Sequence, residues 1–149
     1  MIQCCENHSL TEQLYRLMFD ADKRVSDNAA WLFTHLDAAR RQWLYPKCDE
    51  LMQEAMHTSS ETKCRLLLTL LATQPFREEN LRTDFLDFCM NRMISSGSPA
   101  GIRALCMKLS YLQCKLYPEL LAEFRSTLEM LEEASPLSPA LKVARRSEE

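Results

Sequence analysis

The tripeptide Leu-Tyr-Pro occurs twice in the chain, at residues 44–46 and again at residues 116–118. Each copy follows a segment with helical spacing of apolar residues and opens another such segment. A third, degenerate copy lies between them, so that Tyr45, Leu81 and Tyr117 recur at intervals of 36 residues. Periods of about 20 to 50 residues are typical of repeat arrays. The sequence therefore predicts a helix–turn–helix unit that is repeated along the chain.

Cap residues and apolar spacing predict where the first helices begin. Ser9-x-x-Glu12 is a capping-box pattern and predicts a first helix that ends near Asp20. A second helix is predicted over residues 22–43, where apolar residues recur at helical spacing. These residues are Val25, Ala29, Leu32, Phe33 and Leu36. Thr58-x-x-Glu61 repeats the capping-box pattern ahead of the next helix.

Residues 22–133 can be divided into three such pairs. The second helices are predicted over residues 44–57, 76–94 and 117–133, with Met52, Phe88 and Phe124 in matching core positions. The first helices, over residues 22–43, 60–73 and 98–116, match more loosely, with Val25 and Ile102 in equivalent places. We expect an all-α fold of three antiparallel helix pairs with an extra N-terminal helix and a short C-terminal stub.

Composition fits a helical protein of one domain. The chain has 149 residues, of which 46% are hydrophobic, and only two are glycine, which is few for a protein built from hairpins. We expect a single domain over residues 1–133, followed by a linker and a helical stub over residues 134–149. Ser138-Pro139 opens the stub, whose apolar residues Leu141 and Val143 either cap the last pair or meet another copy or another protein.

The N-terminal segment and the cysteines predict a cytoplasmic protein. The start MIQCCENHSL has neither the basic nor the apolar region of a secretory signal. No apolar run approaches the roughly 20 residues needed to cross a membrane. The cysteines number seven, an odd count that argues against a disulfide framework and for reduced thiols.

These helix pairs resemble HEAT or armadillo-type repeats over residues 22–133. The segment DKRVSDNAAWLFTHL is similar to the outer helix of such a repeat, and YPELLAEFRSTL is similar to the inner helix, which often opens with proline. The resemblance implies an α-solenoid with its inner helices on the concave side, and it implies no reaction. A compact irregular helical bundle is the alternative fold.

Candidates for catalysis or metal binding are few. Cys4, Cys5 and His8 lie close together, but no second pair with zinc spacing follows. His35 and His57 have no identifiable nucleophile or acid partner. The loop SSGSPAG is only superficially similar to the Gly-Ser-Ser loop of the fumarase superfamily, because the Met-Pro-x-Lys-x-Asn run is missing. We predict no cofactor, no metal and no enzymatic activity, with a small all-α enzyme as the least favoured alternative.

Charge differs between the two sets of helices. The outer helices carry +1, +1 and +3, whereas the inner helices carry −2, −1 and −4. The inner acids that fall opposite the apolar stripe are Asp49, Glu50, Glu54, Asp84, Asp87, Glu119, Glu123 and Glu129. In a solenoid they form an acidic concave face, which favours a basic protein or peptide. We therefore expect a non-catalytic adaptor or scaffold, and loss of partner binding without unfolding when Glu50, Glu54 and Glu123 are changed to lysine. The competing interpretation is that these acids are simply solvated.

Nucleic-acid binding, as in HEAT-like DNA glycosylases, is the alternative function. A basic patch on the outer helices supports it, and the patch consists of Lys23, Arg24, Arg40, Arg41 and Trp43. The net charge of −3 opposes it, as does the outer placement, because those glycosylases hold DNA on the concave face. We expect a protein partner rather than a membrane or nucleic acid, with self-association through the C-terminal stub as a further option.

Overall fold

The computed structural model describes the backbone of residues 2–134 and the side chains of residues 9–131. Over that range the chain forms eight α-helices, two 3-10 turns and no strand, which confirms the predicted all-α class. It divides into two compact units, Met1–Gln74 and Pro75–Glu149. The predicted single domain over residues 1–133 stays a prediction. The predicted C-terminal stub lies outside the described residues, except for its first residue, Ala134.

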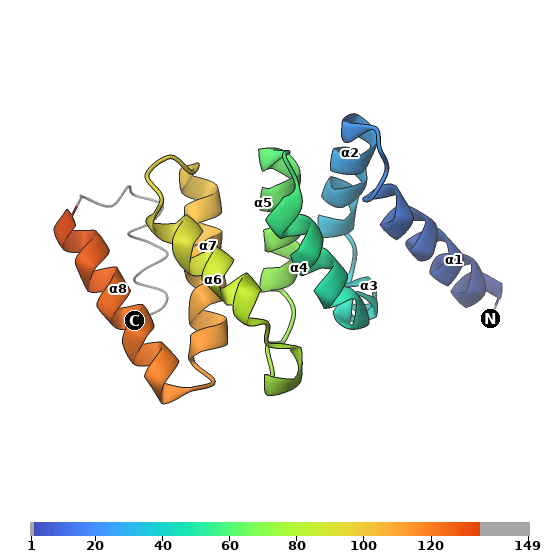
Figure 1. Ribbon diagram of the computed structural model, residues 1–149. Coiled ribbons are helices and arrows are strands. Elements are labelled where there is room, and N and C mark those ends of the chain that lie inside the picture. Colours follow the sequence, from blue (N-terminus) through green and yellow to red (C-terminus); the bar gives the residue numbers. More distant parts are fainter. Residues whose placement is uncertain (1, 135–149) are drawn as a thin grey trace. The chain divides into compact units, whose positions relative to one another are not determined.

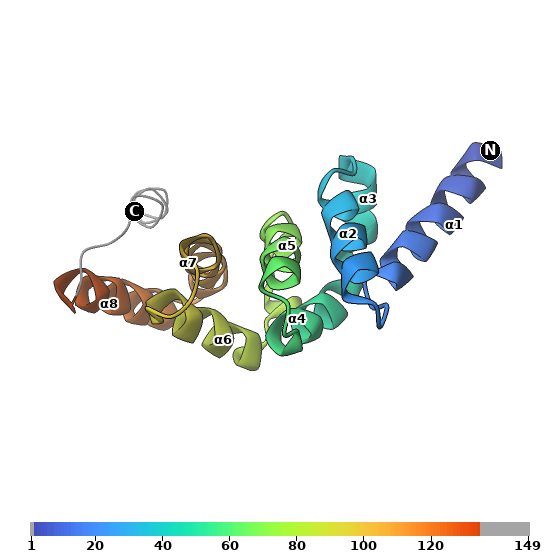
Figure 2. The same cartoon turned by 90° about the horizontal axis from the view of Figure 1, so that it is seen from above.

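The first unit contains five α-helices and a short 3-10 turn (Figure 1). They are α1 (Ile2–Leu17), α2 (Lys23–Thr34), α3 (Ala38–Trp43), η1 (Tyr45–Lys47), α4 (Cys48–His57) and α5 (Glu61–Ala72). Helix α2 contacts both α1 and α5, and α4 contacts α5 (Figures 1 and 2). An aromatic cluster adds to these contacts, because the Tyr15 ring lies edge-on to Phe33 and Trp43 at centroid distances of 6.3 and 5.5 Å. Side chains from α1, α2 and α3 therefore share one core.

Two predicted helix boundaries in the first unit are wrong. Helix α1 begins at Ile2, so Ser9 lies inside the helix and not at its cap. The single helix predicted over residues 22–43 is two helices, because Asp37 caps a new one by accepting a hydrogen bond from the Arg40 backbone N–H at 3.1 Å. The predicted start of α2 is confirmed, since the Asp22 carboxylate accepts from the backbone N–H of Arg24 at 2.9 Å.

The buried side of α2 also differs from the predicted stripe. Val25 and Leu32 are exposed, at 38% and 46%, whereas Ser26, Ala29 and Phe33 are buried. The polar Ser26 belongs to the core side because its hydroxyl donates to the Met18 carbonyl oxygen. The apolar spacing misses Ser26 because serine is polar. The buried side of α2 is therefore rotated around the helix from the predicted apolar stripe.

The cap of α5 is displaced by two residues from its predicted position. The Ser60 hydroxyl oxygen accepts from the Lys63 backbone N–H at 3.1 Å, which makes Ser60 the N-cap. Thr58 instead accepts from the Ser60 backbone N–H at 3.2 Å. The Thr58-x-x-Glu61 capping box is therefore wrong, although the helix that it announced is present.

The described part of the second unit, residues 75–134, contains three α-helices after a 3-10 turn (Figure 1). They are η2 (Glu78–Asn80), α6 (Thr83–Ile94), α7 (Ala100–Cys114) and α8 (Pro118–Ala134). Helix α7 contacts both α6 and α8. The prediction that Pro118 opens a helix is confirmed. The N-cap of α7 is Pro99, and Leu81 precedes α6 instead of lying on the helix predicted over residues 76–94.

Burial differs from two of the predicted equivalences between repeats. The buried stripes of α4, α6 and α8 begin at Cys48, Phe85 and Phe124, at spacings of 37 (48 to 85) and 39 (85 to 124) residues. Phe88, which was expected to match Phe124, is only partly buried and stacks on Phe85 with the ring centroids 6.2 Å apart. The predicted equivalence of the exposed Val25 and the buried Ile102 is also wrong. Met52 and Phe124, the other two predicted core positions, are both buried, and the 36-residue period stays a prediction.

Candidate functional site

A groove in the second unit brings two of the predicted acidic residues together. It lies along α6 and α8, has a volume of about 270 Å³, and receives Asp87 from α6 and Glu123 from α8. The other lining residues are Thr83, Leu86, Met90, Asn91, Ile94, Cys114, Leu120 and Thr127. None of these residues carries a positive charge. The groove is therefore acidic, with apolar walls.

Helical geometry explains why these side chains share one side of α6. Positions three and four residues apart lie above one another on a helix, which places residues 83, 87, 90 and 94 along one edge. The buried residues Phe85, Cys89 and Met93 form a separate stripe, and α6 makes extensive contact with α7. Helix α8 is arranged in the same way, with Phe124 and Leu128 buried while residues 120, 123 and 127 line the groove. Each helix thus uses one side for the core and leaves an adjacent side for the groove.

The two groove carboxylates are not engaged by the fold. Within the described part of the chain, neither Asp87 nor Glu123 has a side-chain hydrogen bond or an ion pair. At the floor, the Cys114 side chain is buried, and burial, followed by the charge of Glu123, raises the pKa of this thiol to about 11. The negative charge of Glu123 therefore disfavours ionisation of the thiol at the bottom of the groove.

Large apolar side chains remain partly exposed next to these carboxylates. Ile94 is 45% exposed, and Leu86, Met90 and Leu120 are half-buried. Contiguous exposed apolar surface that is rimmed by polar groups is typical of interaction sites. The groove combines this property with two unpaired negative charges.

The other predicted acids of the second unit lie outside the groove. Asp84 is held by its neighbour Arg82, with Nη2 and Oδ2 2.6 Å apart, and this hydrogen bond holds the pKa of the Asp84 carboxyl below its usual value. Glu119 and Glu129 are exposed on α8. Because each residue turns a helix by about 100°, Glu129 points about 120° away from Glu123.

In the first unit, two of the three predicted acids stabilise the fold. Glu50 accepts a hydrogen bond from the Tyr15 hydroxyl at 2.7 Å, and burial together with this bond raises the pKa of Tyr15 well above its ordinary value. Glu54 forms an ion pair with Lys63 at 2.7 Å, and the Lys63 side chain is only 6% exposed. Asp49 is exposed in the first turn of α4. The helical pattern could not reveal these partners, because they lie on other helices.

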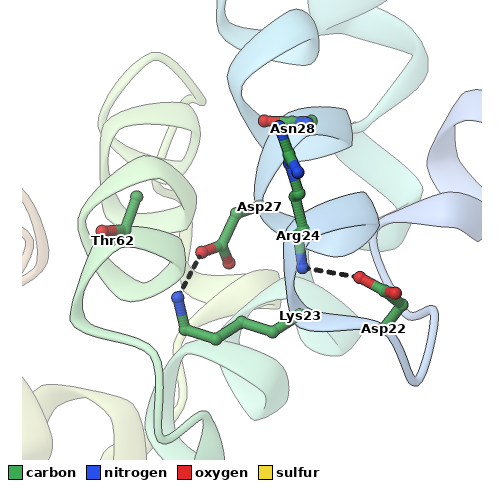
Figure 3. A pocket seen from close by; sticks show the side chains of 6 residues that line it. All are labelled: Asp22, Lys23, Arg24, Asp27, Asn28 and Thr62. Carbon is green, nitrogen blue, oxygen red and sulfur yellow. Dashed lines mark hydrogen bonds and ion pairs between the residues drawn. The ribbon is translucent and has the colours of Figure 1, made fainter.

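The predicted basic patch is divided between the two ends of α2. Lys23 and Arg24 begin the helix, where Lys23 Nζ lies 3.0 Å from Asp27 Oδ2 beside an open cavity of about 580 Å³ (Figure 3). Arg40 and Arg41 are on α3, beyond the other end of a helix about 18 Å long.

Two further members of this patch also have local partners. Arg40 pairs with Asp37 at 3.2 Å. The Trp43 ring belongs to the aromatic cluster with Tyr15 and Phe33. The structure therefore does not gather these residues into one surface.

The described residues contain neither a metal-binding cluster nor a membrane-spanning helix. No cluster of three or more His, Cys, Asp or Glu residues with the arrangement of a metal site occurs among the described residues. The side chains of Cys4, Cys5 and His8 lie outside them. Between residues 2 and 134, no helix has the length and apolar character needed to span a bilayer.

Comparison with known proteins matches the chain to a family model. A family model described as HEAT repeat domain matches residues 1–148. No curated protein and no solved structure matches the chain. The family match extends on both sides of residues 22–133, which carry the repeat pattern in the sequence.

Proposed function

Since the chain belongs to the HEAT repeat family, we propose that it is a non-catalytic interaction module that binds a basic protein or peptide through its inner helices. The resemblance to HEAT repeats that the sequence predicts is confirmed by the family match. HEAT repeats typically mediate protein interactions and are generally non-catalytic. The proposal of a basic ligand rests on the groove of the second unit, in which Asp87 and Glu123 stand without partners among apolar side chains.

The chemistry of the groove favours a positively charged ligand. A lysine or arginine that enters between Asp87 and Glu123 forms charge-assisted hydrogen bonds, which are about twice as strong as neutral ones. A phosphate or an acidic peptide meets two carboxylates and no cation in the lining. The carboxylates select a ligand with positive charge, and burial of apolar ligand surface against the walls of the groove favours binding.

Nucleic-acid binding by the outer helices is the competing function. Its candidate cations Lys23 and Arg40 each have a carboxylate partner on their own helix or at its cap, namely Asp27 and Asp37. Binding to phosphates also falls steeply with salt concentration and is removed by nuclease. Sensitivity to nuclease separates it from protein binding in one experiment, because salt also weakens the binding of a basic protein to an acidic groove.

The test compares two charge reversals on the same helix. Glu123→Lys alters the groove, and Glu129→Lys makes the same change of charge on another side of α8. Each variant and the wild type are used to capture proteins from untreated and from nuclease-treated extract of the source cells, and the captured proteins are quantified by mass spectrometry. We expect basic proteins that Glu129→Lys retains and Glu123→Lys loses.

Two results contradict the proposal. The first is equal loss of the captured proteins with both variants, which indicates a general charge effect. The second is loss of all captured proteins after nuclease treatment, which favours nucleic acid. Circular dichroism of each variant checks that the fold is intact.

A further inference from the structure

The α6 wall of the groove carries an apolar stripe of defined length. Leu86, Met90 and Ile94 recur every four residues along the helix and all line the groove. At a rise of 1.5 Å per residue, the stripe is about 12 Å long. A peptide helix that docks in a groove uses anchor residues at positions i, i+3 or i+4, and i+7, which span about 10 Å. The two lengths match.

The size of the groove favours anchor side chains over a small molecule. Its volume of about 270 Å³ lies below the range of roughly 300 to 1,000 Å³ that is typical of small-molecule pockets. At its bottom lies Cys114, whose side chain is buried. The space therefore suits a few apolar side chains that belong to a larger ligand.

The two carboxylates stand on opposite walls of the groove, one on α6 and one on α8. Asp87 is adjacent to Leu86 on α6, while Glu123 comes from α8, as does the half-buried Leu120. A ligand that fits has an apolar strip with basic residues on both sides. That is the pattern of a basic amphipathic helix.

We infer that the groove along α6 and α8 binds a short basic amphipathic helix of a partner protein, an inference that rests on the proposed function. The helix places apolar side chains against Leu86, Met90 and Ile94, and lysine or arginine residues near Asp87 and Glu123. A helix fits better than an extended strand because it satisfies its own backbone hydrogen bonds. An extended peptide normally pairs with an exposed strand edge, and residues 2–134 contain no strand.

The probe is a random library of displayed 16-residue peptides. It is selected on the wild-type protein and counter-selected on the Asp87→Lys/Glu123→Lys variant, whose fold is checked by circular dichroism. We expect enriched peptides with apolar residues at i, i+3 or i+4 and i+7, flanked by lysine or arginine. Their affinity for Glu123→Lys should fall about tenfold, and their affinity for Glu129→Lys should stay at the wild-type value.

A second pair of variants tests the apolar wall without a change of charge. Ile94→Ser removes an exposed apolar side chain from the groove, and Met130→Ser removes one that is 67% exposed on α8 and is not part of the lining. We expect Ile94→Ser to weaken the selected peptides about fivefold and Met130→Ser to leave them unchanged. Equal effects of the two variants overturn the assignment of the apolar wall.

The outcomes of the selection separate this inference from the proposed function. One outcome is the enrichment of peptides that have alternating apolar residues or many prolines and that fail to bind the doubly reversed variant. Such peptides are not helical, so this outcome overturns the helical ligand and leaves the proposed function standing. If no peptide distinguishes the wild type from the doubly reversed variant, both fail.

Discussion

Lys63 Nζ lies 2.7 Å from Glu54 Oε1 and joins α5 to α4, with the Lys63 side chain only 6% exposed. The same ammonium lies 5.6 Å from the centroid of the Phe19 ring. Burying an ammonium group is costly unless it is paired, because the charge loses its water. Glu54 therefore stabilises the fold. The helical pattern alone makes Glu54 one of the three acids to be changed to lysine in a binding test, but this change would disturb folding and binding together. Glu123 has no such partner and tests binding more cleanly.

The first prediction concerns this ion pair. Glu54→Ala should lower the free energy of unfolding by about 1 to 3 kcal/mol, because it leaves the Lys63 ammonium buried and unpaired. Urea denaturation followed by circular dichroism measures the change. The double variant Glu54→Leu/Lys63→Met should recover most of the loss, since both charges are then absent. A loss no larger than that of the exposed control Glu129→Ala would show that the pair contributes little.

The second prediction concerns the cap of α5. The Ser60 hydroxyl accepts from the Lys63 backbone N–H at 3.1 Å and donates to the Asp27 carboxylate at 3.1 Å, so it links the starts of α5 and α2. Ser60→Ala should lower the free energy of unfolding by about 1 to 2 kcal/mol. Thr58→Ala is the matched control, and its effect should be clearly smaller. The reverse order in chemical denaturation would restore Thr58 as the cap that the sequence predicts.

The third prediction concerns the hydrogen bond between α1 and α4. Tyr15→Phe removes the hydroxyl that donates to Glu50 at 2.7 Å and keeps the aromatic ring that lies 5.1 Å from the ring of Phe19. The free energy of unfolding should fall by about 1 kcal/mol. Tyr117→Phe removes the hydroxyl of a tyrosine that is 36% exposed and should have little effect. Equal stability of the two variants would mean that water replaces the Tyr15 bond without cost.

The sequence predicts the helices better than their ends. Apolar spacing is a property of each helix alone, so the buried residues of α8, such as Phe124 and Leu128, follow from it directly. The ends depend on single side-chain hydrogen bonds, and several serine, threonine and aspartate residues compete for each cap. Asp37 and Ser60 are the ones that the structure uses. Polar core residues such as Ser26 are missed because their partner lies on another segment.

The sequence predicts which acids lie on the inner helices, but it does not predict which of them form the candidate site. Helical spacing identifies the acids on the inner helices, and in the sequence Glu54, Asp87 and Glu123 all look alike. Their roles differ because of tertiary contacts: Glu54 meets a buried lysine, whereas Asp87 and Glu123 face one groove from two helices. Spacing within one helix carries no information about which residues of another helix stand opposite.

The last prediction concerns the thiol at the floor of the groove. Burial, and then the charge of Glu123, raises the pKa of Cys114 to about 11 from an ordinary value of 9.0. The protonated thiol thus stabilises the folded state fully below pH 9, and this contribution is lost as the pH rises through about 11. At pH 8, iodoacetamide should modify Cys114 far more slowly in the native protein than in denaturant, because the thiolate is the reactive form.

Site-resolved mass spectrometry follows the modification of Cys114 separately from that of the other cysteines. Glu123→Gln removes the neighbouring charge, so it should lower the pKa of the Cys114 thiol and speed its modification, while Glu129→Gln should not. The effect of Glu123→Gln should be modest, because burial is the larger cause of the shift and remains in this variant. Equal rates in the native and the denatured protein would show that the floor of the groove is open, and a groove without a closed floor offers no seat for apolar anchor residues.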